Sequence, residues 1–294
     1  MSSTETVDPR YVDIDIWPTV QAVEAMLEGQ ESAVAAIKGE EPRIAAACDA
    51  AAQRLLRGGR LVYCGAGTSG RLAVQDGVEL GPTFGWPDER TAYVIAGGMP
   101  ALMKSVEGAE DDTDAARREV AALSLTADDV VIGVAASGRT RFTIGAITEA
   151  RKAGALTIAI ANNRDTPLAT AAEYPIVAVT GSEVIAGSTR MKAGTAQKAI
   201  LNLLSTGTML RCGRVYRGLM VDMIISNAKL QARAEGMVAT LTGCDAGSAT
   251  AAVKAAAGNI KKAVLIAMGI EPAQAGKALA ENGDNLRRAI ETLK

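Results

Sequence analysis

Three loops rich in glycine and hydroxyl side chains carry the residue types that bind phosphate. The first spans residues 65–70 and the second 135–140; each follows an apolar run and opens a helical segment. The third spans 187–195 and also precedes a helical segment. Backbone N–H groups and hydroxyls at a helix N-terminus donate hydrogen bonds to a phosphate group, and the helix dipole favours the anion. We therefore expect an anion-binding site built from Gly67, Thr68, Ser69, Ser137, Gly138, Arg139, Thr140, Ser188, Thr189 and Lys192.

The spacing of the first loop argues against two nucleotide-binding motifs. A P-loop needs GxxxxGK[ST], and neither that spacing nor its lysine is present. Gly65, Gly67 and Gly70 satisfy GxGxxG, but no acidic residue ends the next apolar run, 92–96, to bind a ribose. A glycine-rich turn alone can be purely structural, and Ser188 can be a plain helix cap. Three such loops in one domain favour a sugar phosphate over unrelated caps.

Glu79 and Glu110 are the candidate groups for proton transfer. The chain has no histidine, so a general acid or base must be Glu, Asp, Lys, Tyr, Cys or an activated water. Glu79 lies roughly 15 Å beyond Ser69 along a straight helix, which predicts that it acts in the site of a neighbouring subunit. Each glutamate also has a simpler interpretation, Glu79 as a solvated surface residue and Glu110 as an acidic helix start.

Composition excludes several classes of function. Without histidine, Ser-His-Asp catalysis and His-ligated zinc are ruled out, and the four cysteines form no CxxC pair. We therefore expect reduced thiols, no metal and a cytoplasmic location. A formal net charge of -2 and 3% aromatic residues argue against nucleic-acid binding. No apolar run reaches the roughly 18 residues needed to span a bilayer.

Apolar patterning predicts the elements that must position these loops. Near-helical spacing up to residue 58 predicts N-terminal helices, with a new one starting at Pro42. Nearly continuous Val/Ile/Leu runs predict buried parallel strands at 60–64, 92–96, 130–135, 156–161 and 176–180. Helical segments between them supply the crossovers, so we expect a doubly wound α/β sheet. Ligands in such sheets bind beyond the carboxyl ends of the strands, where the first two hydroxyl loops fall.

Helical patterning returns after Ser188. We expect helices over 194–211 and 219–240, then an alanine-rich tail with breaks at Gly258, 269–272 and Gly283. Three short helices in a small bundle are the expected arrangement of this tail. The predicted organisation is an N-terminal helical segment (1–58), an α/β domain with its following helices (59–240) and the small bundle (241–294).

Six segments together resemble the N-acetylmuramic acid 6-phosphate etherases, within the wider group of sugar isomerase (SIS) domains. They are GAGTSGRL, the Glu79 region with PTFG, VEGAED, AASGRT, GSTRMKAGTAQK and LMVD, in family order between Gly58 and Arg233. The resemblance implies a flavodoxin-like SIS fold and cleavage of the D-lactyl ether of N-acetylmuramic acid 6-phosphate, giving N-acetylglucosamine 6-phosphate and D-lactate in cell-wall sugar recycling. It also implies no cofactor and a homodimer with its site near the subunit interface. Net charge, aromatic content and the lack of a long apolar run already argue against a nucleic-acid or membrane partner.

The same resemblance assigns roles to the candidate residues. Glu79 would be the acid that assists lactate departure and Glu110 a second acid or base, while the hydroxyl loops would bind the phosphate and the sugar. The chain departs from the family pattern at 78–82, where it has VELGP and the family usually has SECPP, and at Arg141, where the family usually has proline. The predicted helix that leads to Glu79 also contains Gly77, and a glycine inside a helix lowers stability by roughly 1 kcal/mol relative to alanine.

Two other functions share this fold and these loops. A phosphosugar isomerase moves a proton between C1 and C2 with no leaving group. A non-catalytic sugar-phosphate regulator binds the same ligands without turnover, and the glucokinase regulatory proteins share the architecture. A sugar-responsive transcription factor would need a basic DNA-binding segment ahead of the sheet, whereas residues 1–59 carry ten acidic and five basic residues. Release of D-lactate separates the etherase from these alternatives.

Overall fold

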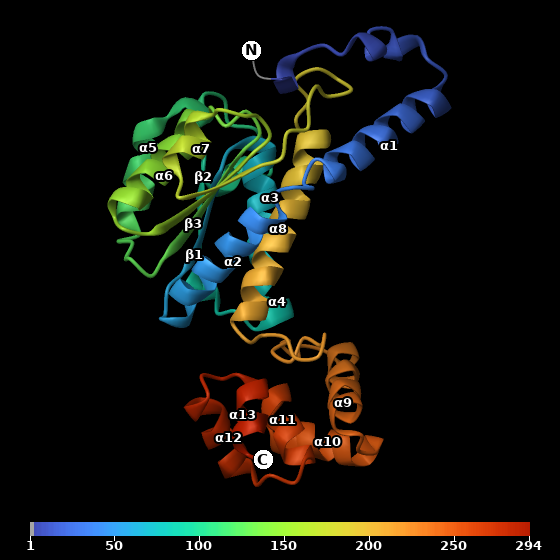
Figure 1. The fold of residues 1–294 in the computed structure, drawn as a ribbon, viewed down its shortest axis with the longest axis vertical. Helices are drawn as coiled ribbons and strands as arrows, with labels where there is room; N and C mark the ends of the chain where they lie inside the picture. Colours follow the sequence, from blue (N-terminus) through green and yellow to red (C-terminus); the bar gives the residue numbers. More distant parts are fainter. Residues whose placement is uncertain (1–2) are drawn as a thin grey trace. The chain divides into compact units, whose positions relative to one another are not determined.

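The computed structural model describes residues 3–294, and within them the strands form a five-stranded parallel sheet in the order β2-β1-β3-β4-β5 (Figure 1). The strands are β1 (Leu61–Gly65), β2 (Thr91–Ile95), β3 (Val130–Ala135), β4 (Leu156–Ala161) and β5 (Tyr174–Val177). β1, β3 and β4 are buried along their whole length, which is why their sequences are nearly continuous apolar runs. The predicted doubly wound α/β fold is confirmed.

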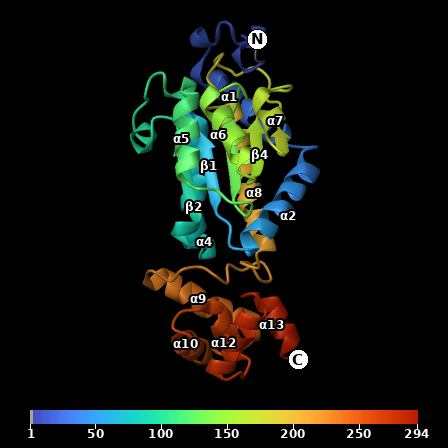
Figure 2. The same ribbon diagram turned by 90° about the vertical axis from the view of Figure 1, so that its left-hand side faces the viewer.

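Helices cover both faces of the sheet. Those on one face are α5 (Thr113–Ala122), α6 (Arg141–Lys152) and α7 (Pro167–Ala171). Those on the other face are α2 (Glu41–Leu56), α3 (Gly67–Val78) and α8 (Lys192–Arg211). Val62 and Cys64 of β1 point into the first layer, whereas Tyr63 points into the second and donates a 2.9 Å hydrogen bond to Asp76 of α3. Ser205 of α8 donates to the same carboxylate at 3.0 Å, so α3 and α8 are joined through a buried acid. Figure 2 shows α5 and α6 in front of the strands.

The last strand begins and ends earlier than predicted. β5 pairs with β4 from Tyr174 opposite Ile158 to Val177 opposite Ala161. Because β4 ends at Ala161, the ladder stops with the 3.0 Å bond from the Ala178 N–H to the Ala161 carbonyl. The predicted strand over 176–180 is therefore wrong in its second half.

The N-terminal segment is helical, as predicted. Its helices are α1 (Thr19–Ala35) and α2, and three short 3-10 turns precede them at Ser3–Glu5, Pro9–Tyr11 and Ile14–Ile16. Pro42 lies in the first turn of α2. Backbone N–H groups in a first turn have no partner within the helix, so a proline there costs no hydrogen bond. The expected helix start at Pro42 is confirmed. Among the helices of the described chain, none is both long and apolar enough to cross a membrane.

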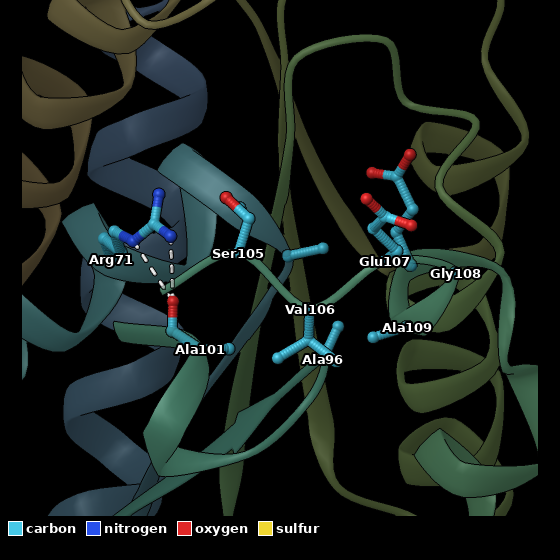
Figure 3. Close-up of a pocket in the computed structure, with 11 residues that line it drawn as sticks. Arg71, Ala96, Ala101, Ser105, Val106, Glu107, Gly108 and Ala109 are labelled. Carbon is cyan, nitrogen blue, oxygen red and sulfur yellow. Dashed lines mark hydrogen bonds between the residues drawn. The ribbon is translucent and has the colours of Figure 1, made fainter. Parts of the chain in front are cut away.

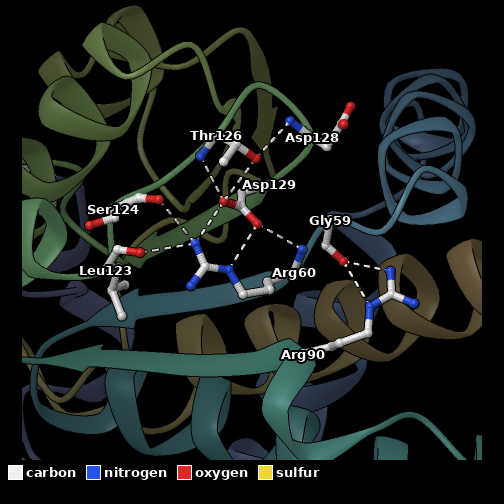
Figure 4. A network of polar contacts seen from close by, with 8 residues as sticks. All are labelled: Gly59, Arg60, Arg90, Leu123, Ser124, Thr126, Asp128 and Asp129. Carbon is white, nitrogen blue, oxygen red and sulfur yellow. Dashed lines mark hydrogen bonds and ion pairs between the residues drawn. The ribbon is translucent and has the colours of Figure 1, made fainter.

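A polar network joins the amino ends of β1 and β3 (Figure 4). Asp129 accepts hydrogen bonds from the Arg60 backbone N–H (2.8 Å), from Arg60 Nε (3.0 Å) and Nη2 (2.8 Å), and from the Thr126 N–H (2.8 Å). Burial acts to raise the pKa of Asp129, but the hydrogen bonds from Arg60 and Thr126 outweigh it and hold that pKa below its ordinary value. The network secures the edge of the sheet opposite to the hydroxyl loops.

The chain forms two compact units. The described residues up to Gly77, with Glu89–Gly207, form the first unit, and Val78–Asp88 with Thr208–Lys294 form the second. The helices that lie wholly in the second unit are α4 (Leu80–Phe84), α9 (Ala228–Thr242), α10 (Ala246–Ala255), α11 (Ile260–Ala267), α12 (Pro272–Glu281) and α13 (Leu286–Thr292). Its core contains a nearly inaccessible lysine, Lys261, paired with Asp222 (2.8 Å) and Asp284 (2.6 Å). The domain boundaries expected at 58 and 240 stay a prediction; the compact units divide elsewhere.

The second unit corrects two predictions about its helices. α9 begins only after Asn227, whose side chain accepts the Leu230 N–H, so the expected helix over 219–240 is wrong over its first residues. Val221 and Met223 are apolar because they pack into the core of this unit. Beyond Gly243 there are four helices where three were expected, because every segment between the predicted breaks has its own start signal. Those signals are the capping side chains of Asp245, Asn259 and Asn285 and the proline at the start of α12.

Candidate functional site

The strand order places two of the hydroxyl loops side by side. β1 and β3 are adjacent and parallel, with Gly65 opposite Val134, and loops 65–70 and 135–140 lie at their carboxyl ends. In the order β2-β1-β3-β4-β5 the direction of winding reverses between β1 and β3. The crevice at such a switch point is where flavodoxin-like sheets bind their ligands. The first two loops therefore flank the expected ligand position.

The first loop turns β1 into α3 within two residues. A Cβ atom on Gly65 would lie 2.9 Å from the Gly70 nitrogen, so the two backbones approach too closely for larger residues. Gly67 begins α3, and Thr68 and Ser69 follow in its first turn. Neither hydroxyl is hydrogen-bonded to another of the described residues. Both are therefore available to donate to an anion at the start of this helix.

The second loop is held by its own hydrogen bonds. Ser137 Oγ accepts the Arg139 N–H at 3.1 Å, and the Gly138 N–H donates to the Ala135 carbonyl at 3.0 Å. Thr140 is the N-cap residue of α6, but its side chain makes no capping bond. The Ser137 hydroxyl thus closes a turn within the loop, whereas the Thr140 hydroxyl makes no hydrogen bond to the start of α6.

A buried glutamate holds the third loop. Glu183 is fully buried, and its two carboxylate oxygens accept the N–H groups of Lys192 (2.8 Å) and Ala193 (2.9 Å). The N-terminus of α8 therefore already carries an anion of the protein's own. Lys192 Nζ donates to the Ser182 carbonyl at 3.0 Å. Ser188, Thr189 and Lys192 stay predictions as ligand-binding residues.

A cavity of about 380 Å³ lies beside the first loop, in the first unit (Figure 3). It is lined by Ala66, Gly67, Arg71, Ala96, Ala101, Ser105, Val106, Glu107, Gly108, Ala109 and Glu110. Of the predicted site residues, the cavity brings together Gly67 and Glu110. Glu110 is exposed, and Asp112 is the residue that caps α5 by accepting the Ala115 N–H at 2.8 Å. A plain capping role therefore falls to Asp112.

Three polar residues of this cavity were missed by the sequence analysis: Arg71, Ser105 and Glu107. Figure 3 shows the Arg71 side chain on one side of the cavity and Glu107 on the other. Arg71 directly follows the first loop within GAGTSGRL, and Glu107 lies within VEGAED. Arginine and glutamate are common on protein surfaces, so their residue types alone do not indicate a site. The one feature of the sequence that could have identified them is their position inside these two family motifs.

Glu79 belongs to the other compact unit. It is exposed and directly precedes α4, whereas the three hydroxyl loops and Glu110 belong to the first unit. Its role as a catalytic acid, and its expected action in a neighbouring subunit's site, stay predictions.

Together, these groups suit a small anionic ligand and proton transfer. The helix start of α3 offers backbone N–H groups and free hydroxyls, and the cavity beside it adds one guanidinium and two carboxylates.

The fold and the site define a SIS-type α/β protein. The SIS domain model matches residues 104–206, and the model of the glucokinase regulatory protein N-terminal SIS domain matches residues 43–151.

Solved structures have the same fold. The chain is similar to a phosphoheptose isomerase from Francisella tularensis, with a TM-score of 0.51 and 19% identity, over 66% of this chain and 100% of that one. It is also similar to a Bacteroides fragilis protein described as a phosphosugar isomerase involved in capsule formation, with a TM-score of 0.53 and 20% identity, over 68% of this chain and 95% of that one. At this level of identity the likeness establishes the fold alone.

Relatives of known name define the family more narrowly. The chain is 47% identical to the N-acetylmuramic acid 6-phosphate etherase of Deinococcus radiodurans, over 98% of this chain and 94% of that protein. It is 48% identical to the etherase of Streptomyces coelicolor, over 98% of this chain and 93% of that protein. The chain belongs to the N-acetylmuramic acid 6-phosphate etherase family.

Proposed function

We propose that this chain is a carbon–oxygen lyase that cleaves the D-lactyl ether of N-acetylmuramic acid 6-phosphate. Its products are N-acetylglucosamine 6-phosphate and D-lactate, and the reaction serves the recycling of cell-wall sugars. The observation that carries the proposal is the 47% and 48% identity to etherases over 98% of the chain. The location of Gly67 and Glu110 at one cavity supports it.

The chemistry needs only an acid, a base and an anchor for the phosphate. In the open-chain sugar the C1 aldehyde acidifies the C2 proton, which a carboxylate removes. The C3–oxygen bond then breaks as a carboxylic acid protonates the departing oxygen, leaving a C2–C3 double bond. Water adds to C3, and a proton returns to C2. We assign the proton transfers to Glu110 and Glu79, and phosphate binding to the loops that contain Ser69, Ser137 and Ser188.

The test is incubation of the purified protein with N-acetylmuramic acid 6-phosphate in oxygen-18 water. Release of D-lactate, with the label at C3 of the sugar product, is the expected result. Release of lactate without label at C3 would contradict elimination and hydration. Binding of the sugar phosphate without lactate release would instead favour a regulator, and interconversion of aldose and ketose phosphates would favour an isomerase.

We also propose a cytoplasmic homodimer that packs through α1. Val20, Val23, Leu27 and Val34 recur along one side of this helix, and each is at least 51% exposed. Apolar side chains at this spacing form a stripe that a second copy can cover. Light scattering after gel filtration should give twice the monomer mass for the native chain. The double variant Val23→Glu, Leu27→Glu should give a monomer, and the control Glu24→Gln a dimer.

A mixing experiment tests whether Glu79 acts across the dimer. Glu79→Gln and Glu110→Gln proteins are unfolded, mixed and refolded together, so that mixed dimers form. If each site takes one glutamate from each subunit, a mixed dimer holds one intact site and lactate release returns. If both glutamates of a site come from one chain, no mixed dimer contains an intact site, and activity stays absent.

A further inference from the structure

Arg71 is the one basic residue among the described residues that line the cavity beside the first loop. It lies on α3, directly after Gly70, and is half-buried. Its Nε donates to the carbonyls of Ala101 (3.2 Å) and Leu102 (3.0 Å), and its Nη2 donates to the Ala101 carbonyl at 2.8 Å. These bonds hold the guanidinium plane in place at the wall of the cavity (Figure 3).

The bonds to the two carbonyls leave part of the guanidinium unused. A guanidinium has five N–H donors. One on Nε and one on Nη2 are taken, and Nη1 makes no hydrogen bond to another described residue. The edge formed by Nη1 and Nη2 therefore keeps a pair of parallel donors. This fork matches the two oxygens of a carboxylate.

The chemistry of the substrate supplies such a carboxylate. The substrate of the proposed function carries two anionic groups, the 6-phosphate and the carboxylate of the lactyl ether. Free hydroxyls at the start of α3 suit the phosphate. Glu107 and Glu110 line the same cavity and would repel a second anion there, so that anion needs a cation beside it. Arg71 is the one cation among the described residues of this lining.

We propose that Arg71 binds the lactyl carboxylate and so distinguishes N-acetylmuramic acid 6-phosphate from N-acetylglucosamine 6-phosphate, which lacks it. This inference rests on the proposed function and adds a specificity-determining residue to it. The contact is made by the group that leaves, so it orients the C3–oxygen bond with respect to the acid. It is lost to the sugar product once lactate departs, which favours release of that product.

The test compares the affinities of these two sugar phosphates. Both are titrated by calorimetry into Glu79→Gln protein, which is expected not to consume the substrate, and then into the same protein carrying Arg71→Gln. We expect the affinity for N-acetylmuramic acid 6-phosphate to fall about 10- to 100-fold, as for loss of a charged hydrogen-bonded pair. The affinity for N-acetylglucosamine 6-phosphate should stay the same. Arg71→Lys, which keeps the charge and loses the fork, should give an intermediate loss.

Lys104→Gln is the matched control. It removes a positive charge from an exposed position one residue before Ser105, outside the cavity lining, and should change neither affinity. An equal loss for both sugar phosphates would overturn the inference, because Arg71 would then act on the phosphate or only on the fold. Unchanged affinities would overturn it as well. Failure of the native protein to release lactate would instead count against the proposed function, while the ratio of the two affinities would still report on Arg71.

Discussion

Gly138 occupies a position in the second hydroxyl loop where no other residue fits. Its φ is +62°, and a Cβ atom there would lie 2.4 Å from Thr166 Oγ1 and 2.5 Å from Thr166 Cβ. Thr166 is 1% exposed, and its hydroxyl caps α7 by accepting the Ala169 N–H. Thr166 can therefore move only by giving up that cap. We predict that Gly138→Ala strongly destabilises the first unit.

The magnitude follows from three contributions. The left-handed backbone costs an alanine about 1–2 kcal/mol, a lost cap about 0.5–2 kcal/mol, and an overfilled core about 1–3 kcal/mol. Together these lower the free energy of unfolding by about 2.5–7 kcal/mol, against a typical total of about 5–15 kcal/mol. Gly181→Ala is the matched control, because φ is +70° there and no atom lies within 4 Å of the added Cβ. It should cost only the backbone contribution, about 1–2 kcal/mol.

The assay is urea unfolding of both variants, followed by far-UV circular dichroism, with hydrogen exchange measured over residues 130–150. Gly138→Ala should shift the unfolding midpoint much further than Gly181→Ala and should deprotect β3 and the start of α6. Equal shifts for the two variants would refute the reasoning, because the contact with Thr166 would then have no energetic effect.

Three further predictions concern buried charges. Lys261→Met should lower the free energy of unfolding by about 3–5 kcal/mol, because it leaves the Asp222 carboxylate buried without its closest cation; thermal unfolding measures this, and adding Asp222→Asn should recover part of the loss. Burial acts to raise the pKa of Asp129, but hydrogen bonds from Arg60 and Thr126 outweigh it, so the pKa is lower in the folded than in the unfolded chain. The carboxylate therefore stabilises the fold above its unfolded-state pKa of about 4, and this contribution is lost as the pH falls through the folded-state pKa. Urea midpoints at decreasing pH should fall less steeply in Asp129→Asn. Glu183→Gln should cost about 1.5–3 kcal/mol in chemical unfolding, because an amide nitrogen cannot accept an N–H of α8; an unchanged midpoint would contradict this.

The sheet could be predicted because its signal is local. β1, β3 and β4 are buried on both faces, so each must be apolar throughout, and this requirement is visible in a single stretch of sequence. The same local signal misled the prediction at 219–227, because apolar residues buried by distant helices look like one face of a helix. The glycine and hydroxyl loops were found because phosphate binding uses consecutive residues.

Gly77 illustrates what only the tertiary structure could decide. From the sequence, a glycine inside a helix costs roughly 1 kcal/mol relative to alanine and has no evident purpose. In the fold, a Cβ atom there would lie 2.7 Å from Tyr93 Oη and 2.9 Å from Tyr63 Cε2, so the two tyrosine rings require the glycine.

The sequence by itself determined the fold class, the family and the loops that follow the strands, because each is recognised from a series of short segments whose residues are neighbours in the chain. Tertiary structure decided which polar side chains share a cavity. Arg71 of α3 follows β1 in the chain, and Glu110 follows β2. Both line one cavity because β2 lies next to β1 in the sheet. Such a meeting depends on strand order, and strand order is set by the packing of the whole unit.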